Sequence, residues 1–302
     1  MKVLMLHDVR AFDKNFFPQR YAQHSFLTQN QFLNGLKALN KNLIEPILLE
    51  VGNRPLCENE VLLTFDDGLK DHLKVAEILA DKGKKAVFFI PFGVIQSGEF
   101  IASHLIQFLI AGADLTKLST WIANELIKLG CSLDCINKFA VSKWENNLWH
   151  RDQVFVTRVL REYGDSKKRK KLLMSALATF FSYDLGALHE NLYLTSADIV
   201  EINRMGHTIG SHGWMSCDLR YEESNIIERE LIFPLDVLKG ISDKNPWISF
   251  ANGGTSEIIE RECRKAGYTC AFGTEHKSIS NFSLERFNLP RLDGSKLGEF
   301  CE

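Results

Sequence analysis

Short, mostly apolar runs alternate with longer amphipathic segments over both ends of the chain. The apolar runs have the length of buried strands and lie at 3–6, 61–65, 86–90, 207–212, 247–250 and 269–272. After the second run, residues 70–82 place Leu73, Ala76 and Leu79 on one side and stop at Gly83, which predicts an amphipathic helix. Strand, helix and strand within about 30 residues form a βαβ unit, and this connection requires parallel strands.

The middle of the chain has a different pattern. From 98 to 191 strand-like runs nearly vanish, and helices are expected at 104–111, 118–129, 154–163 and 168–181. Outside this block, further helices are expected at 25–39, 196–205, 222–238 and 256–266. We therefore expect an α/β fold, a distorted (β/α) barrel formed by residues 1–97 and 192–302, with 98–191 as an inserted helical block. In such a barrel the chemistry lies at the carboxyl ends of the strands.

Composition narrows the classes of partner. The 302 residues carry 36 Lys and Arg against 38 Asp and Glu, a net charge of −2, which argues against nucleic-acid binding. No apolar run reaches the roughly 18 residues of a membrane span, and the N-terminal sequence lacks the features of a signal peptide. The seven cysteines are scattered, as expected of free thiols. These features predict a cytoplasmic protein without a transmembrane segment.

The sharpest chemical signal is Asp66-Asp67-Gly68, directly after the apolar strand at 61–65. Adjacent acids at a strand end point in different directions, and glycine allows a tight turn. One carboxylate can bind a divalent metal while its neighbour accepts a proton from water. The alternative is a helix N-terminus, where aspartate is also favoured.

Two other strands end in residues that would face the same mouth of the barrel. Residues 207–212 end in His212, and the first strand ends in His7-Asp8. His207 alternates away from the mouth, so we expect it to be structural.

Together these motifs resemble the polysaccharide deacetylases, carbohydrate esterase family four. The resemblance rests on Asp66-Asp67-Gly68, on the Gly-His-x-x-Gly-Ser-His run that ends at His212, and on 250–254 and 289–292. It implies a distorted barrel and metal-dependent removal of an N-acyl group from an amino sugar. Asp66 would be the general base, and Asp67 and His212 would bind the metal, most simply zinc.

The family places a second metal-binding histidine four residues after the first, and here that position is Ser216. A serine hydroxyl is a poor zinc ligand. Three interpretations follow: His7 or Cys217 replaces the missing imidazole, water fills the gap and the metal is held weakly, or the site has lost its metal. The arginine expected before Asn252 is also missing.

Two late residues could complete the machinery. Arg291 could reach Asp66 from a later strand and hold it ionised, with a surface position as the alternative. His276, in the loop after the strand at 269–272, could protonate a leaving amine, although a solvated loop histidine is the simpler interpretation.

Substrate contacts are expected from Trp214, two residues after His212, and from Asn252 and Gly253 in the third motif. The cationic run at 167–171 is either a solvated helix face or a contact for a phosphate or an anionic membrane surface. The substrate implied by the resemblance is an acetylated amino sugar, nucleotide- or lipid-linked, in surface-polysaccharide biosynthesis. The alternatives are a catalytically inactive barrel that binds glycan or a partner enzyme, and a deformylase.

Overall fold

The computed structural model describes residues 1–9, 26–39, 41–50, 56–140, 151–279, 282–295 and 297. The chain divides into two compact units. The first unit contains the described residues up to Ile101 and from His189 onward, and the second contains Ala102–Leu188.

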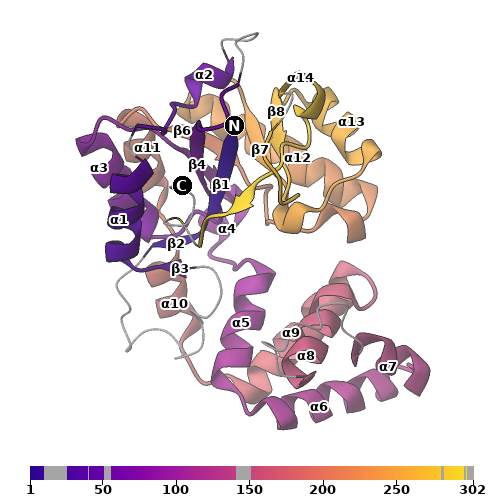
Figure 1. Ribbon diagram of the computed structural model, residues 1–302. Coiled ribbons are helices and arrows are strands. Elements are labelled where there is room, and N and C mark those ends of the chain that lie inside the picture. The colour runs from indigo at the N-terminus through magenta and orange to yellow at the C-terminus, as the bar shows by residue number, and fades with distance from the viewer. Residues whose placement is uncertain are drawn as a thin grey trace. The chain divides into compact units, whose positions relative to one another are not determined.

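The first unit is built on a seven-stranded sheet (Figure 1). Its strands follow the order β8-β7-β6-β5-β4-β1-β9, and neighbouring strands pair in parallel. Its strands are β1 (Lys2–Leu6), β4 (Val61–Phe65), β5 (Val87–Ile90), β6 (Thr208–Ser211), β7 (Trp247–Ser249), β8 (Cys270–Phe272) and β9 (Leu292–Asp293). A separate pair joins β2 (Asp8–Val9) to β3 (Phe26–Leu27), also in parallel.

The C-terminal part of the chain links the two edges of this sheet. Leu289 forms a parallel bridge with Phe272 at the end of β8. Three residues later, Leu292 pairs with Leu4 of β1. The segment from Leu289 to Asp293 therefore connects β8 to β1, and the expected distorted (β/α) barrel is confirmed.

Two hydrophobic clusters follow from the alternation of side chains along these strands. On β4 and β5, Leu63 and Phe88 belong to the cluster shared with the surrounding helices, whereas Leu62, Val87 and Phe89 belong to a second cluster. The second cluster also contains Trp247, Phe272 and Leu289 from the other strands, so it fills the inside of the barrel. On each strand, every second residue counted from a member of this second cluster therefore points inward.

Along the chain, most helices of the first unit connect one strand to the next. They are α1 (Gln29–Leu39), α2 (Ile47–Glu50), α3 (Asp71–Asp81), α4 (Phe92–Ser97), α11 (Ser196–Arg204), α12 (Ser224–Ile241), α13 (Glu257–Ala266) and α14 (Phe282–Glu285). Helix α11 begins with a capping box in which Thr195 and Asp198 satisfy each other's amides. Ser256 caps α13, and Gly267, at a φ of 110°, ends it.

The described part of the second unit consists of helices joined by short loops. It contains α5 (Ala102–Gly112), α6 (Leu115–Lys128), α7 (Leu133–Ala140), α8 (Arg151–Glu162) and α9 (Ser166–Phe180), and α10 (Leu185–Leu192) begins in it. The cationic run at 167–171 lies in the first turns of α9. Its four lysines are exposed, whereas Arg169 is buried and donates to the carbonyl of Gly164 at 2.8 Å.

Two composition-based expectations concern the described part of the chain. No helix there combines the length and apolarity needed to cross a membrane. Its six cysteines are free thiols.

Candidate active site

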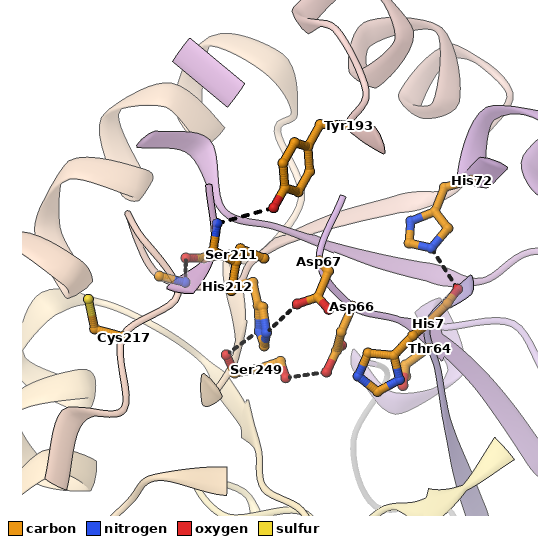
Figure 2. A network of polar contacts seen from close by, with 12 residues as sticks. His7, Thr64, Asp66, Asp67, His72, Tyr193, Ser211, His212, Cys217 and Ser249 are labelled. Atoms are coloured by element: carbon orange, nitrogen blue, oxygen red, sulfur yellow. Dashed lines mark hydrogen bonds and ion pairs between the residues drawn. The ribbon is translucent and has the colours of Figure 1, made fainter. Parts of the chain in front are cut away.

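The inward-facing positions of four strands bring the candidate residues together at the mouth of the barrel. On β4, Thr64 and Asp66 continue the inward parity of Leu62, and on β7 Ser249 continues that of Trp247. On β6, Thr208 pairs with the inward-facing Val87, and His212 continues the inward positions of Thr208. His7 follows β1 and continues the inward position of Val3. Figure 2 shows these side chains gathered around Asp66 and Asp67.

Asp66 and Arg291 form a buried ion pair, with side chains 2% and 0% exposed. The guanidinium donates to both carboxylate oxygens, Nη1 to Oδ1 at 2.8 Å and Nη2 to Oδ2 at 2.7 Å. This two-pronged geometry is the strongest arrangement available to an arginine and a carboxylate. It holds the Asp66 side chain in one orientation.

Hydroxyl groups and a carbonyl support the pair. The Arg291 Nε donates to the Gly273 carbonyl at 2.9 Å, and Nη1 also contacts the Thr64 hydroxyl at 3.2 Å. The Ser249 hydroxyl accepts from Arg291 Nη2 at 2.7 Å and donates to Asp66 Oδ2 at 3.1 Å. Thr64 in turn donates to the Leu4 carbonyl at 2.8 Å. The guanidinium is therefore fixed by β1, β4, β7 and the segment after β8.

Burial by itself raises the pKa of Asp66, but the charges of Arg291 and His212 outweigh it and leave the pKa below its usual value. Asp66 is consequently a carboxylate at neutral pH, in spite of its burial. It can accept hydrogen bonds and a proton.

Asp67 and His212 form a second pair beside the first. Asp67 adopts a left-handed backbone with a φ of 77°, which turns its carboxylate away from Asp66 and toward His212. Its Oδ1 lies 3.2 Å from His212 Nε2. The other ring nitrogen, Nδ1, donates to the Ser249 carbonyl at 2.9 Å. Ser249 thus contacts both pairs, through its hydroxyl and through its backbone.

The contact between Asp67 and His212 requires a positive charge. Because Nδ1 carries the proton given to Ser249, Nε2 of a neutral ring would direct a lone pair at the carboxylate. A proton or a metal cation resolves this conflict. Burial by itself lowers the pKa of His212, but the carboxylates of Asp66 and Asp67 outweigh it and raise the pKa.

The donor chemistry of Asp67 and His212 fits two ligands of a divalent cation, one carboxylate oxygen and one imidazole nitrogen. Among the described residues, no group of three or more His, Cys, Asp or Glu side chains is placed to hold a metal. The pair would therefore supply two of the three protein ligands usual in a catalytic zinc site.

Three residues are candidates for a third metal ligand: Ser216, Cys217 and His7. Ser216 is buried, with a left-handed backbone at a φ of 57°. Burial and the nearby Glu230 charge raise the pKa of Cys217 well above its usual value, so its thiol stays protonated. Its sulfur lies apart from the pair in Figure 2. His7 lies on the Asp66 side of the site, where its charge contributes to the lowered pKa of Asp66.

The expected substrate-contact residues and His276, the expected proton donor, lie on loops. Trp214 is half-buried, and its ring packs over Gly93 and edge-on to Phe233, at 5.4 Å between ring centres. Asn252 is exposed in the loop after β7, with a left-handed φ of 53°. A Cβ at Gly253 would collide with the Thr274 hydroxyl, so this position requires glycine. His276 is exposed in the loop after β8.

Sequence reasoning missed Thr64 and Ser249. Each is a hydroxyl residue at an inward position of an otherwise apolar strand, and each is fully buried. A polar residue two positions before Asp66 was the available signal for Thr64. His207, expected to be structural, accepts from the Ala86 amide at 3.2 Å and contacts the Ala76 carbonyl at 3.0 Å, on the outer face of the sheet.

Comparisons with known proteins agree on the fold. No protein-family profile matches the sequence, and no curated protein matches it significantly. The structure is similar to the Streptococcus pyogenes deacetylase PplD, with a TM-score of 0.60 and 13% identity over 100% of this chain and 98% of that one. A polysaccharide deacetylase from Bacillus cereus gives a TM-score of 0.56 and 14% identity, over 100% of this chain and 68% of that one.

A de-N-acetylase from Aggregatibacter actinomycetemcomitans gives a TM-score of 0.53 and 16% identity, over 99% of this chain and 98% of that one. At such identities the likeness establishes the fold. The chain therefore has the fold of the polysaccharide deacetylases, in agreement with the family resemblance of its motifs.

Proposed function

We propose that this protein is a carbohydrate N-deacylase that hydrolyses the acetamide of an amino sugar. The observation that carries the proposal is the pairing of Asp66 with Arg291 directly beside the pairing of Asp67 with His212. Asp66 is held as a carboxylate. Asp67 faces an imidazole nitrogen, and this contact needs a proton or a metal cation between the two groups. Amide hydrolysis uses both features.

Asp66 is the proposed proton acceptor. Arg291 holds its carboxylate ionised and oriented, and Ser249 and Thr64 keep the guanidinium in place. A proton taken from water would stay on the Asp66 carboxyl group, because the guanidinium beside it has no lone pair to accept a proton. The role of Arg291 is therefore to position and ionise the base.

Asp67 and His212 are the proposed ligands of a divalent cation, with zinc as the first choice. When bound there, the cation supplies Lewis acidity, which polarises the acyl carbonyl and makes water more acidic. The Ser249 carbonyl fixes the His212 tautomer so that Nε2 is the ligating nitrogen.

His7 is the proposed proton donor to the leaving amine. It lies at the mouth, half-buried, on the far side of Asp66 from His212 in Figure 2. This position favours it over the exposed His276, and it differs from the assisting metal ligand that the sequence suggested. Trp214, Asn252 and Gly253 would line the sugar, and the substrate would be a nucleotide- or lipid-linked precursor of a surface polysaccharide.

The test is release of acetate from a panel of N-acetylated amino sugars: a nucleotide-linked sugar, a lipid-linked sugar and a free oligosaccharide. N-formyl versions of the same compounds test deformylation. We expect turnover by the zinc-supplemented protein, at least 100-fold lower in Asp66→Asn, since one general base contributes roughly 10²–10⁴-fold. Equal turnover in Asp66→Asn would remove Asp66 from the mechanism.

A second candidate function is a glycan-binding barrel without catalysis. Ser216 favours it, because this residue stands where the family has an imidazole. A cation at Asp67 and His212 is therefore left with two protein ligands among the described residues. Binding of the same sugars without acyl release, in wild type and Asp66→Asn alike, would support this candidate.

A further inference from the structure

Glu230 is a buried acid that the proposed reaction does not use. It lies on the inner face of α12 and is 1% exposed, among buried residues such as Leu231 and Pro234. The neighbouring residue Arg229 is the nearest charged group in the sequence, and its Nη2 lies 3.8 Å from Glu230 Oε1. Burial raises the pKa of Glu230, while hydrogen bonds from backbone amides act in the opposite direction. A carboxylate in such a place requires specific partners.

Those partners are backbone amides of the loop that follows His212. The Met215 amide donates to both carboxylate oxygens, at 3.0 Å and 2.9 Å, and the Cys217 amide reaches Oε2 at 3.5 Å. Gly213 completes the fit, because a Cβ at this position would lie 2.5 Å from Oε2. The loop from Gly213 to Cys217 is therefore wrapped around the carboxylate.

The same loop is fixed on its other side. The Gly93 amide, in α4, donates to the Trp214 carbonyl at 2.7 Å, and a Cβ on Gly93 would lie 2.5 Å from Trp214 Nε1. At its start, the Gly213 amide donates to the Ser211 hydroxyl at 3.0 Å. Between these attachments Ser216 is held in its left-handed conformation. The loop has few ways to shift unless one of these contacts breaks.

We propose that Glu230 is a positioning residue for the active site: by binding the amides of the loop from Gly213 to Cys217, it fixes the direction of His212 and the place of Ser216 and Trp214. An apolar side chain could fill this position in α12 without burying a charge. It could not satisfy the Met215 and Cys217 amides. This inference rests on the proposed function for its kinetic readout and on the structure alone for its spectroscopic one.

The experiment compares Glu230→Leu and Glu230→Gln with a matched control on the same helix. Leucine removes the buried charge and keeps α12 packed, and glutamine keeps the volume but offers one acceptor oxygen in place of two. The control is Asp236→Asn, because Asp236 is 73% exposed and contacts Lys239. Circular dichroism and thermal unfolding select the variants that fold.

Two measurements follow on the folded variants. The first is the ring ¹⁵N signal of His212, identified by its loss in His212→Gln, which reports the ring's surroundings whether or not the protein has activity. The second is kcat and KM for acetate release. We expect the His212 signal to move in both Glu230 variants and kcat to fall at least tenfold with KM within about twofold. Asp236→Asn should match wild type in both.

The outcomes separate the two proposals. A moved His212 signal in Glu230→Leu, with no acetate released by wild type, would support the positioning role and reject the deacylase. An active, folded Glu230→Leu with wild-type kcat and an unmoved His212 signal would overturn the positioning role and leave the deacylase standing.

Discussion

The charge on Asp66 depends chiefly on Arg291, and both members of the Asp66–Arg291 pair are almost completely buried. Replacing Arg291 with methionine leaves a carboxylate inside the barrel without its cation. Loss of one partner of a buried pair costs about 3–5 kcal/mol. We therefore predict that Arg291→Met lowers the free energy of unfolding by that amount, measured by urea denaturation, and abolishes turnover.

The double variant Asp66→Asn/Arg291→Met is the control for this prediction. Because it removes both charges, it should recover at least half of the stability lost in the single variant, while remaining inactive. An Arg291→Met protein as stable as wild type would contradict the assignment of a charged Asp66.

Substitutions of Ser216 test whether Asp67 and His212 bind a metal cation. Its φ of 57° is a conformation that histidine and asparagine tolerate better than most residues. We predict that Ser216→His tightens zinc binding at least tenfold, because a third protein ligand joins Asp67 and His212. Ser216→Asn is the matched control, since it suits the same backbone but lacks an imidazole. Isothermal titration of the chelator-stripped proteins measures the difference, and equal affinities would show that position 216 does not reach the cation.

The residues of the site differ in how far the sequence could predict them. Asp66, Asp67 and His212 stand in motifs at strand ends, so both their closeness and their resemblance to a family were visible in advance. Ser249 and Glu230 were not, because their partners lie on other segments of the chain. Ser249 contacts the side chains of Asp66, His212 and Arg291, and Glu230 binds the amides of Met215 and Cys217. Contacts between separate segments leave no motif in the sequence.

At the scale of elements, periodicity located the long helices and the six principal strands. Its failures were short elements, such as α4 (Phe92–Ser97) and α10 (Leu185–Leu192), which have too few residues for a helical period to appear. The closing segment was visible as the motif at 289–292 near the end of the chain, without an indication of its partners. Its pairing with β8 and β1 depends on the whole barrel.

His207 joins two elements and gives the fold a dependence on pH. Its Nδ1 accepts from the Ala86 amide beside β5, so Nε2 carries the proton given to the Ala76 carbonyl in α3. Burial lowers its pKa to about 4 from the usual 6.5. The unfolded chain therefore binds the proton more readily, and stability is lost as the pH falls from about 6.5 toward 4.

The expected size of this loss is about 3 kcal/mol for His207 alone. We predict that His207→Gln is less stable than wild type at pH 7 but has a shallower decline between pH 6.5 and 4, in urea unfolding at a series of pH values. His72, buried with a pKa also lowered to about 4, should account for part of the remaining slope. Parallel curves for wild type and His207→Gln would contradict the neutral, bridging role.

At the scale of the whole molecule, the site exists only when the barrel is closed. Asp66 and Arg291 are 225 residues apart in sequence, and His212 and Ser249 come from two further strands. The charge of Asp66 and the orientation of His212 are thus consequences of global folding. A cation that binds Asp67 and His212 binds the folded state alone, so its affinity is linked to stability.

This linkage gives a prediction that needs no substrate. At a free zinc concentration ten times its Kd, binding should stabilise the fold by about 1.4 kcal/mol, which raises Tm by roughly 2–4 °C. Removal of the metal with a chelator should reverse the shift without unfolding the protein, because in the metal-free state a proton on His212 supplies the positive charge that faces Asp67. Asp67→Ala and His212→Ala should show no zinc-dependent shift in scanning calorimetry, whereas His276→Ala, at an exposed loop position, should keep it. A shift of equal size in all four proteins would place the zinc elsewhere and leave the Asp67–His212 contact as a proton-bridged pair.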